Sequence, residues 1–190
     1  SGELGEIRLA LLEEGLEGFH RLRAAQARAE QFAFDGDGDR MGAVDDLGRI
    51  ISPDHLLMLF ARDVLKRAPG ATIIADVKTS DVFFNDVKTA GGEPLMWLTG
   101  HAHIKTKLAE TCAKFAGEAS GHIFFTDEYY GYDDGIYAAL RLIRLVLESG
   151  KKLSELVDEL PPIFASPEIR IPCADDKKFA IVQALEYQFP

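Results

Sequence analysis

The sequence predicts an α/β fold, with a mixed and largely parallel sheet flanked by helices. Between residue 72 and about residue 150, short apolar runs rich in β-branched or aromatic side chains alternate with longer stretches of helical period. Proline, glycine and capping residues separate these segments, as they do at the ends of strands and helices. The apolar content of 47% in a chain of 190 residues is ample for a hydrophobic core.

The first part of the chain predicts helix and then short strands. Residues 1–31 predict one helix or two short ones, because their leucines recur every three or four positions. The apolar residues 32–34 and 41–44 predict short strands on either side of an acidic loop. Residues 49–51 follow a turn and are expected to pair with the second of these strands.

The α/β unit begins at Ser52 and Pro53, which are typical of a helix start. The expected helices cover residues 53–67, 81–90, 102–113 and 135–148, and the expected strands cover 72–77, 95–98 and 123–125. The last of these helices is apolar around nearly its whole circumference, so we expect it to be heavily buried. A short helix over 153–160, a strand over 168–171 and a helix over 176–185 complete the prediction.

The composition argues against several kinds of partner. The chain has 31 acidic and 21 basic residues, a formal net charge of -10, which disfavours nucleic acid. Apolar runs fall short of the roughly 20 residues that span a bilayer, so a membrane partner is not expected. Two cysteines, Cys112 and Cys173, are too few for a disulfide framework and lack metal-ligand spacing. A reducing, cytoplasmic location is therefore expected.

Residues 35–40, Asp-Gly-Asp-Gly-Asp-Arg, form the acidic loop and predict a cation site. The carboxylates of Asp35, Asp37 and Asp39 repel one another unless a cation neutralises them, and oxygen ligands suit Mg²⁺ or Ca²⁺. A calcium EF-hand requires glycine at loop position six and glutamate at position twelve, where this chain has Arg40 and Asp46. A purely structural acidic turn is the remaining alternative.

Polar clusters follow the expected strands, where parallel sheets bind their ligands. They consist of Lys78, of Thr99-Gly100-His101, and of Glu118, Ser120 and His122. Taken singly, the lysine could lie on the surface, the first histidine could cap a helix, and the second could be a satisfied strand residue. Their convergence at one edge is the stronger indication of function.

These motifs resemble those of the α-D-phosphohexomutases. The acidic loop is similar to the metal-binding loop of that family, and residues 117–122, Gly-Glu-Ala-Ser-Gly-His, are similar to its sugar-binding loop. Residues 76–78 and 99–101 correspond to family segments that line the active site. Residues 32 to about 185 follow the family order, and the bacterial phosphomannomutase/phosphoglucomutase branch is the most similar.

The resemblance implies reversible transfer of a phosphoryl group between the 1- and 6-positions of a hexose phosphate, of glucose or mannose. It implies a phosphoserine donor, one Mg²⁺ per active site, and glucose or mannose 1,6-bisphosphate as intermediate and activator. The metal ligands would be Asp35, Asp37 and Asp39. The implied catalytic residues are Lys78, His101, His122 and Arg40, and the implied substrate-binding residues are Gly100, Glu118, Ser120 and His122.

The resemblance also implies a division into domains. Residues 1–53 would belong to a partial metal-loop domain (with 1–31 unassigned), 54–165 to a sugar-binding α/β domain, and 166–190 to the start of a phosphate-binding domain. The family's phosphoserine loop, Thr/Ser-Ala-Ser-His-Asn-Pro, does not occur in these 190 residues. We therefore expect the chain to be inactive alone and to need the remaining domains of a full-length enzyme.

Other functions stay open at this point. The substrate could be a phosphoglucosamine or a phosphopentose, although Glu-X-Ser-Gly-His is more typical of the glucose and mannose phosphate enzymes. A noncatalytic module that binds magnesium or a sugar phosphate is the alternative from another functional class.

Overall fold

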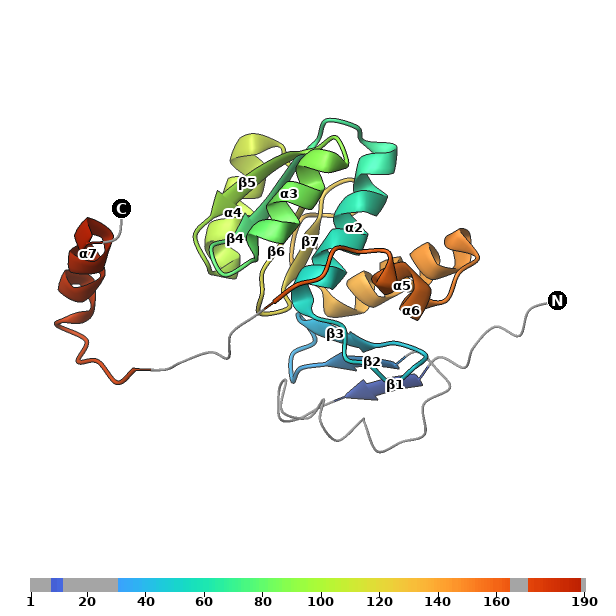
Figure 1. Cartoon of the computed structure of the whole chain (residues 1–190), viewed down its shortest axis with the longest axis horizontal. Helices are drawn as coiled ribbons and strands as arrows, with labels where there is room; N and C mark the ends of the chain where they lie inside the picture. Colours follow the sequence, from blue (N-terminus) through green and yellow to red (C-terminus); the bar gives the residue numbers. More distant parts are fainter. Residues whose placement is uncertain (1–7, 12–30, 165–170, 189–190) are drawn as a thin grey trace.

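The computed structural model describes residues 8–11, 31–164 and 171–188. The described residues form a three-stranded sheet, a four-stranded sheet and helices around them. Figure 1 shows the smaller sheet below the larger one, with helix α7 (Lys178–Gln188) apart from both. Within the described ranges, no helix is both long and apolar enough to cross a membrane.

The larger sheet has the strand order β5-β4-β6-β7 and is mixed and largely parallel, as predicted. Its strands are β4 (Thr72–Asp76), β5 (Glu93–Trp97), β6 (Phe115–Gly117) and β7 (Ile123–Phe125). Strand β4 pairs in parallel with β5 and β6, and β7 is antiparallel to β6. The sequence did not predict β6, because two of its three residues are Ala and Gly, which are depleted in strands.

Helices cover both faces of this sheet. They are α2 (Pro53–Arg67), α3 (Asp81–Thr89), α4 (His101–Thr111), α5 (Gly135–Ser149) and α6 (Leu153–Asp158). The predicted start of α2 is confirmed, since the Ser52 hydroxyl accepts a hydrogen bond from the His55 N–H at 3.2 Å.

Successive residues of β4 point to opposite sides of the sheet, as the period of a strand requires. Ile73 and Ala75 belong to the larger core cluster, which α2, α3 and α5 also form with the smaller sheet. Ile74 lies in the second cluster, against Ile104 and Leu108 of α4. Helix α4 therefore covers one face of the sheet, and the other helices cover the opposite face.

The smaller sheet consists of β1 (Arg8–Leu11), β2 (Gln31–Phe34) and β3 (Met41–Val44). The helix predicted over residues 1–31 is wrong for residues 8–11, which pair in parallel with β2. Sheet pairing overrides the helical spacing of leucines there. Gln31, at the other end of the predicted helix, belongs to strand β2, and residues 1–7 and 12–30 lie outside the described residues.

The pairing expected between residues 49–51 and strand β3 is confirmed, although it is too short to form a regular strand. The structure has a single antiparallel bridge there, between Val44 and Ile50. The chain leaves the sheet at this point because Ser52 already caps helix α2.

Helix α5 is less buried than predicted. Ala138, Leu142 and Leu145 pack in the core, whereas Ile136 is 60% exposed and Leu140 is 59% exposed. One stripe of the helix covers the sheet, and the apolar residues of the opposite stripe face away from it.

Toward the C-terminus, residues 168–170 of the expected strand lie outside the described residues, and Ile171 is irregular. The helix expected over 176–185 is confirmed as α7.

Candidate active site

The ends of β4, β5 and β6 lie at one edge of the sheet, because these strands are parallel. Asp76, the last residue of β4, is fully buried and joins the loops that follow all three strands. Its Oδ1 accepts hydrogen bonds from the Thr79 hydroxyl at 2.8 Å and the Ala119 N–H at 3.1 Å. Its Oδ2 accepts one from the Thr99 hydroxyl at 2.9 Å. A single carboxylate thus holds three predicted site segments together.

Glu118 fixes the start of helix α4. Glu118 is only 1% exposed, and its Oε1 accepts a hydrogen bond from the Gly100 N–H. Gly100 has a φ of 125°, a conformation that L side chains rarely adopt. The bond places His101, the first residue of α4, at the edge of the sheet.

The acidic loop connects β2 and β3 and brings its three aspartates together. One carboxylate oxygen each from Asp35, Asp37 and Asp39 lie within 4.8 Å of one another. Asp35 is buried, and its Oδ1 accepts a hydrogen bond from the Arg40 N–H at 3.2 Å. The Arg40 Nε donates to the other oxygen of Asp35. Arg40 therefore stabilises the conformation of the loop through hydrogen bonds to its first residue.

The electrostatics of the acidic loop favour a bound cation. Burial raises the pKa of Asp35, but hydrogen bonds from Arg40 and its charge hold that pKa below the ordinary value. The pKa of Asp39 is raised, mainly by burial. The charge of His122 lowers this pKa, whereas the charges of Asp35 and Asp37 raise it further. The buried Oδ1 of Asp39 accepts no hydrogen bond among the described residues. Oxygen donors with uncompensated charge fit Mg²⁺.

The acidic loop packs directly against the 117–122 loop and helix α5. Arg40 and His122 form an antiparallel bridge, and the Met41 N–H donates to the Gly121 carbonyl at 3.3 Å. The Gly135 N–H donates to the Gly38 carbonyl at 2.9 Å. A Cβ at Gly135 would lie 2.6 Å from the Arg40 carbonyl oxygen, so that only glycine fits without a shift of backbone.

Two of the predicted histidines lie around one carboxylate. The Nδ1 of His122 is 3.0 Å from the Oδ2 of Asp133, and the Nδ1 of His101 is 3.5 Å from the same oxygen. The two imidazole rings stack with centroids 5.7 Å apart and planes 18° apart. Lys105 Nζ donates to the Oδ1 of Asp133 at 2.9 Å.

Asp133 stays ionised within this cluster. Burial raises its pKa, but the hydrogen bond from Lys105, together with the charges of Lys105 and His122, lowers the pKa below its ordinary value. The side chain of Asp133 is only 7% exposed. The result is a buried negative charge shared by two imidazoles and an ammonium group.

Most of the predicted site residues meet at this edge of the structure. Lys78 is exposed on the turn after β4, and Ser120 is half-buried in the 117–122 loop. Lys105 and Asp133 were missed as site residues, and Asp76 was included only as part of the segment 76–78, without a role of its own. One signal for Asp133 was available, since a helix needs one cap and Asp134 supplies it by accepting from the Tyr137 N–H at 2.8 Å.

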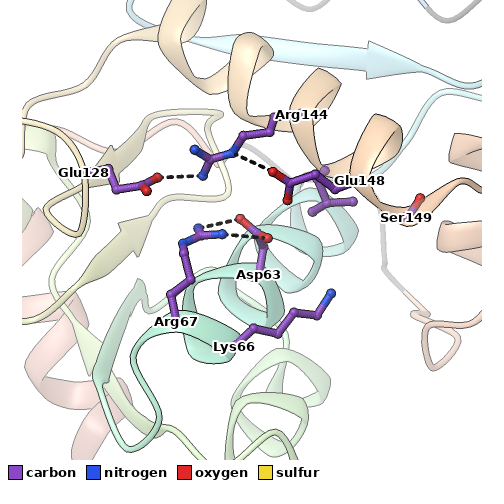
Figure 2. A pocket seen from close by; sticks show the side chains of 8 residues that line it. Asp63, Lys66, Arg67, Glu128, Arg144, Glu148 and Ser149 are labelled. Atoms are coloured by element: carbon purple, nitrogen blue, oxygen red, sulfur yellow. Dashed lines mark hydrogen bonds and ion pairs between the residues drawn. The ribbon is translucent and has the colours of Figure 1, made fainter.

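A separate pocket of about 400 Å³ lies at the other end of helix α2. The pocket borders Arg67, at the C-terminal end of α2. Asp54 lies at the N-terminal end of the same helix, where it accepts a hydrogen bond from the Ser80 N–H at 2.9 Å. Figure 2 shows that its arginines are paired, Arg67 with Asp63 and Arg144 with Glu128. The charges of this pocket mostly satisfy one another.

Comparison with known proteins decides the family. Residues 52–164 match the family described as phosphoglucomutase/phosphomannomutase, alpha/beta/alpha domain III. This chain belongs to the α-D-phosphohexomutase family. A phosphomannomutase/phosphoglucomutase of Pseudomonas aeruginosa is 47% identical over 166 residues, which covers 85% of this chain and 36% of that protein. The chain thus lies in the bacterial branch of the phosphohexomutases and spans about a third of the length of such relatives.

Solved phosphohexomutase structures share the fold. A phosphoglucomutase/phosphomannomutase family protein of Burkholderia thailandensis is 49% identical, with a TM-score of 0.72 over 80% of this chain and 33% of that one. An N-acetylphosphoglucosamine mutase of Aspergillus fumigatus, solved in complex with GlcNAc-6P and magnesium, is 15% identical. Its TM-score is 0.58 over 72% of this chain and 36% of that one, a likeness of fold alone.

Proposed function

We propose that this chain is part of a phosphohexomutase that interconverts the 1- and 6-phosphates of glucose or mannose. The phosphoryl group passes through a phosphoserine and a 1,6-bisphosphate that also serves as activator. The observation that supports the proposal is the meeting of the acidic loop with the loops after β4, β5 and β6, in a chain of this family. A cytoplasmic location is part of the proposal, in keeping with two free cysteines.

The acidic loop would hold one Mg²⁺ through Asp35, Asp37 and Asp39. When bound, Mg²⁺ supplies positive charge that stabilises the oxygens of a transferring phosphoryl group. The chain's own contribution is to fix the geometry of the ligands. Arg40 pairs with Asp35 and forms a backbone bridge with His122, so it holds the acidic loop beside the proposed substrate-binding loop 117–122. We also assign Arg40 a place beside the phosphoserine.

The substrate would lie along the loops at the sheet edge. Gly100, Glu118, Ser120 and His122 form the proposed substrate-binding set. The Glu118–Gly100 hydrogen bond gives the set a fixed backbone frame before the sugar arrives. Ser120, which is half-buried on the same loop, has a hydroxyl suited to a sugar hydroxyl.

The cationic side chains would contact phosphate oxygens and move protons. We assign this role to Lys78, His101 and His122, since imidazole titrates near neutral pH. Asp133 and Lys105 fix the two imidazoles through the contacts already described. These groups act by position and charge, which is the main demand of phosphoryl transfer on a protein.

The domain division proposed for the chain is 1–53, 54–165 and 166–190. With the phosphoserine loop absent from these 190 residues, we propose that the chain does not turn over alone. The test is a coupled assay for conversion of glucose 1-phosphate to glucose 6-phosphate, with Mg²⁺ and glucose 1,6-bisphosphate present. No turnover above the blank is expected, and measurable turnover would show the proposed dependence on the missing domains to be wrong.

A chimera tests the reaction itself. Residues 32–164 would replace the matching third of the Pseudomonas aeruginosa relative, and the chimera would be assayed with glucose, mannose and glucosamine 1-phosphates and with ribose 1-phosphate. Activity with the hexose phosphates, abolished by Asp39→Asn, is expected. Preference for glucosamine or pentose phosphate supports the other mutases, and a folded chimera that binds substrate without turnover supports the noncatalytic module.

A further inference from the structure

A second group of possible metal ligands overlaps the acidic loop but has a different chemistry. Asp39, His122 and Asp133 each offer one ligand atom, and the three atoms lie within 4.8 Å of one another. The acidic loop offers only carboxylate oxygens, whereas this group includes an imidazole nitrogen. Mg²⁺ prefers oxygen ligands, and Zn²⁺ and other divalent transition metals bind imidazole readily.

The distances in this group match the spacing of ligands around one metal ion. Bonds of about 2.1 Å place neighbouring ligand atoms about 3.4 Å apart in a tetrahedral zinc site and about 3.0 Å apart at an octahedral one. The Nδ1 of His122 lies 3.0 Å from the Oδ2 of Asp133 and 3.6 Å from the Oδ2 of Asp39. Both separations suit a shared metal.

Two of the ligand atoms are buried, face each other at 3.0 Å and make no hydrogen bond within the described part of the chain. The Nδ1 of His122 and the Oδ2 of Asp133 make no hydrogen bond among the described residues, although both atoms are shielded from solvent. The side chain of Asp133 is 7% exposed, and its Oδ2 points at His122. Buried polar atoms without hydrogen-bond partners are uncommon and call for an explanation such as an ion.

Neighbouring groups hold the ligands in place, as the surroundings of metal sites commonly do. Lys105 occupies the Oδ1 of Asp133, which leaves the Oδ2 facing His122. The ring of His101 stacks on that of His122 and fixes its plane. These contacts restrict the orientation of both side chains.

We propose that Asp39, His122 and Asp133 form a site for a zinc-class divalent transition metal, distinct from the oxygen-only site of the acidic loop. Asp39 belongs to both sites, so the two metals compete for it. The competition rests on the proposed magnesium site, but binding of Zn²⁺ to the three residues does not.

The test is metal binding to the 190-residue chain, with Cys112 and Cys173 replaced by serine to remove exposed thiols. Calorimetric titration with Zn²⁺ and with Mg²⁺ gives the affinities, and the visible spectrum with Co²⁺ as probe reports the coordination. We expect His122→Gln and Asp133→Asn each to weaken Zn²⁺ binding at least about tenfold and to leave Mg²⁺ binding nearly unchanged.

Asp37→Asn is the matched control, because Asp37 belongs only to the acidic loop. It should weaken Mg²⁺ binding and spare Zn²⁺ binding, and Asp39→Asn should weaken both. Circular dichroism confirms that each variant is folded. Absence of Zn²⁺ binding would overturn the proposal, as would Zn²⁺ affinity that follows Asp37 rather than His122 and Asp133. None of these readouts depends on mutase turnover, so the proposed function is tested separately.

Discussion

The carboxylate of Asp76 accepts a hydrogen bond from the backbone N–H of Ala119, a residue 43 positions away in the chain. The bond ties the end of β4 to the 117–122 loop, and the same carboxylate also holds Thr79 and Thr99. A buried acceptor with three donors cannot change its geometry or lose an accepting oxygen without releasing at least one of the loops it joins.

Asp76→Asn should therefore loosen the site while leaving the sheet in place. An amide has one accepting oxygen instead of two, so at least one donor loses its partner. We expect a loss of about 1–3 kcal/mol in the free energy of unfolding and weaker binding of glucose 1-phosphate, measured by urea denaturation and NMR titration. Asp81→Asn, on an exposed residue of α3, is the control and should change neither. Equal behaviour of the two variants would contradict the role given to Asp76.

Gly135→Ala should disturb the acidic loop from a helix outside it. The added Cβ would meet the Arg40 carbonyl at 2.6 Å, so the start of α5 and the loop must move apart. We expect a loss of about 1–3 kcal/mol in stability and weaker Mg²⁺ binding, measured by thermal unfolding and calorimetry. Gly36→Ala is a control within the loop, where a Cβ meets nothing within 4 Å. A Gly135 variant that binds Mg²⁺ as well as the Gly36 variant would rule out this coupling.

The ion pair of Arg141 and Asp127 should govern part of the acid sensitivity. Both nitrogens at the end of the Arg141 guanidinium donate to Asp127, each at 2.9 Å, and the arginine side chain is 3% exposed. Burial raises the pKa of Asp127, but Arg141 and then Arg67 lower it below the ordinary value of 3.8. The stabilisation is therefore fully present above about pH 4 and is lost as pH falls through the lowered pKa.

Asp127→Asn removes the bidentate partner of the buried Arg141 charge, which keeps only its longer carboxylate contacts with Asp63 at 3.4 Å and Glu128 at 3.5 Å. At neutral pH we expect a loss of about 1–3 kcal/mol in the free energy of unfolding, and the difference from the parent should shrink as acid protonates Asp127 in the parent. Urea denaturation across the acid range measures both. Glu110→Gln, at a half-exposed partner of Lys107 outside this network, should cost only about 0–1 kcal/mol. A difference that stays constant with pH would argue against the ion pair as its source.

Helix α5 offers a test of which face is buried. Leu142→Gln places a polar group in the core, where Leu142 is fully buried, and should cost about 2–5 kcal/mol or prevent folding. Leu140→Gln, two positions earlier and largely exposed, should change stability by no more than about 0.5 kcal/mol. Chemical denaturation compares the two. A large loss at Leu140 would mean that its face is covered in solution.

Local signals in the sequence account for much of the fold. Ser52 was placed at a helix start because capping depends on neighbouring residues alone. Strand β1 was mistaken for helix because its pairing with β2 involves residues far along the chain. The burial of α5 was misjudged for a similar reason, since an apolar pattern does not say which stripe meets the sheet.

In the candidate site, too, the residues grouped by local sequence were predicted, and Asp133, which long-range packing adds to the site, was missed. Asp35, Asp37 and Asp39 were found together because they are close in sequence. Asp133 gains its role from Lys105 and His122, which reach it only after the sheet and helices have packed. Its position beside a capping residue was the one local hint.

The contacts of the acidic loop with Gly121, His122 and Gly135 also set what can move. They clamp the three-stranded sheet onto the four-stranded one at the point where the site forms. Rotation of one sheet against the other would break these backbone hydrogen bonds and move the carboxylates of the acidic loop away from the 117–122 loop. The two sheets should therefore behave mechanically as one block, on which the ligand geometry is set before any ligand arrives.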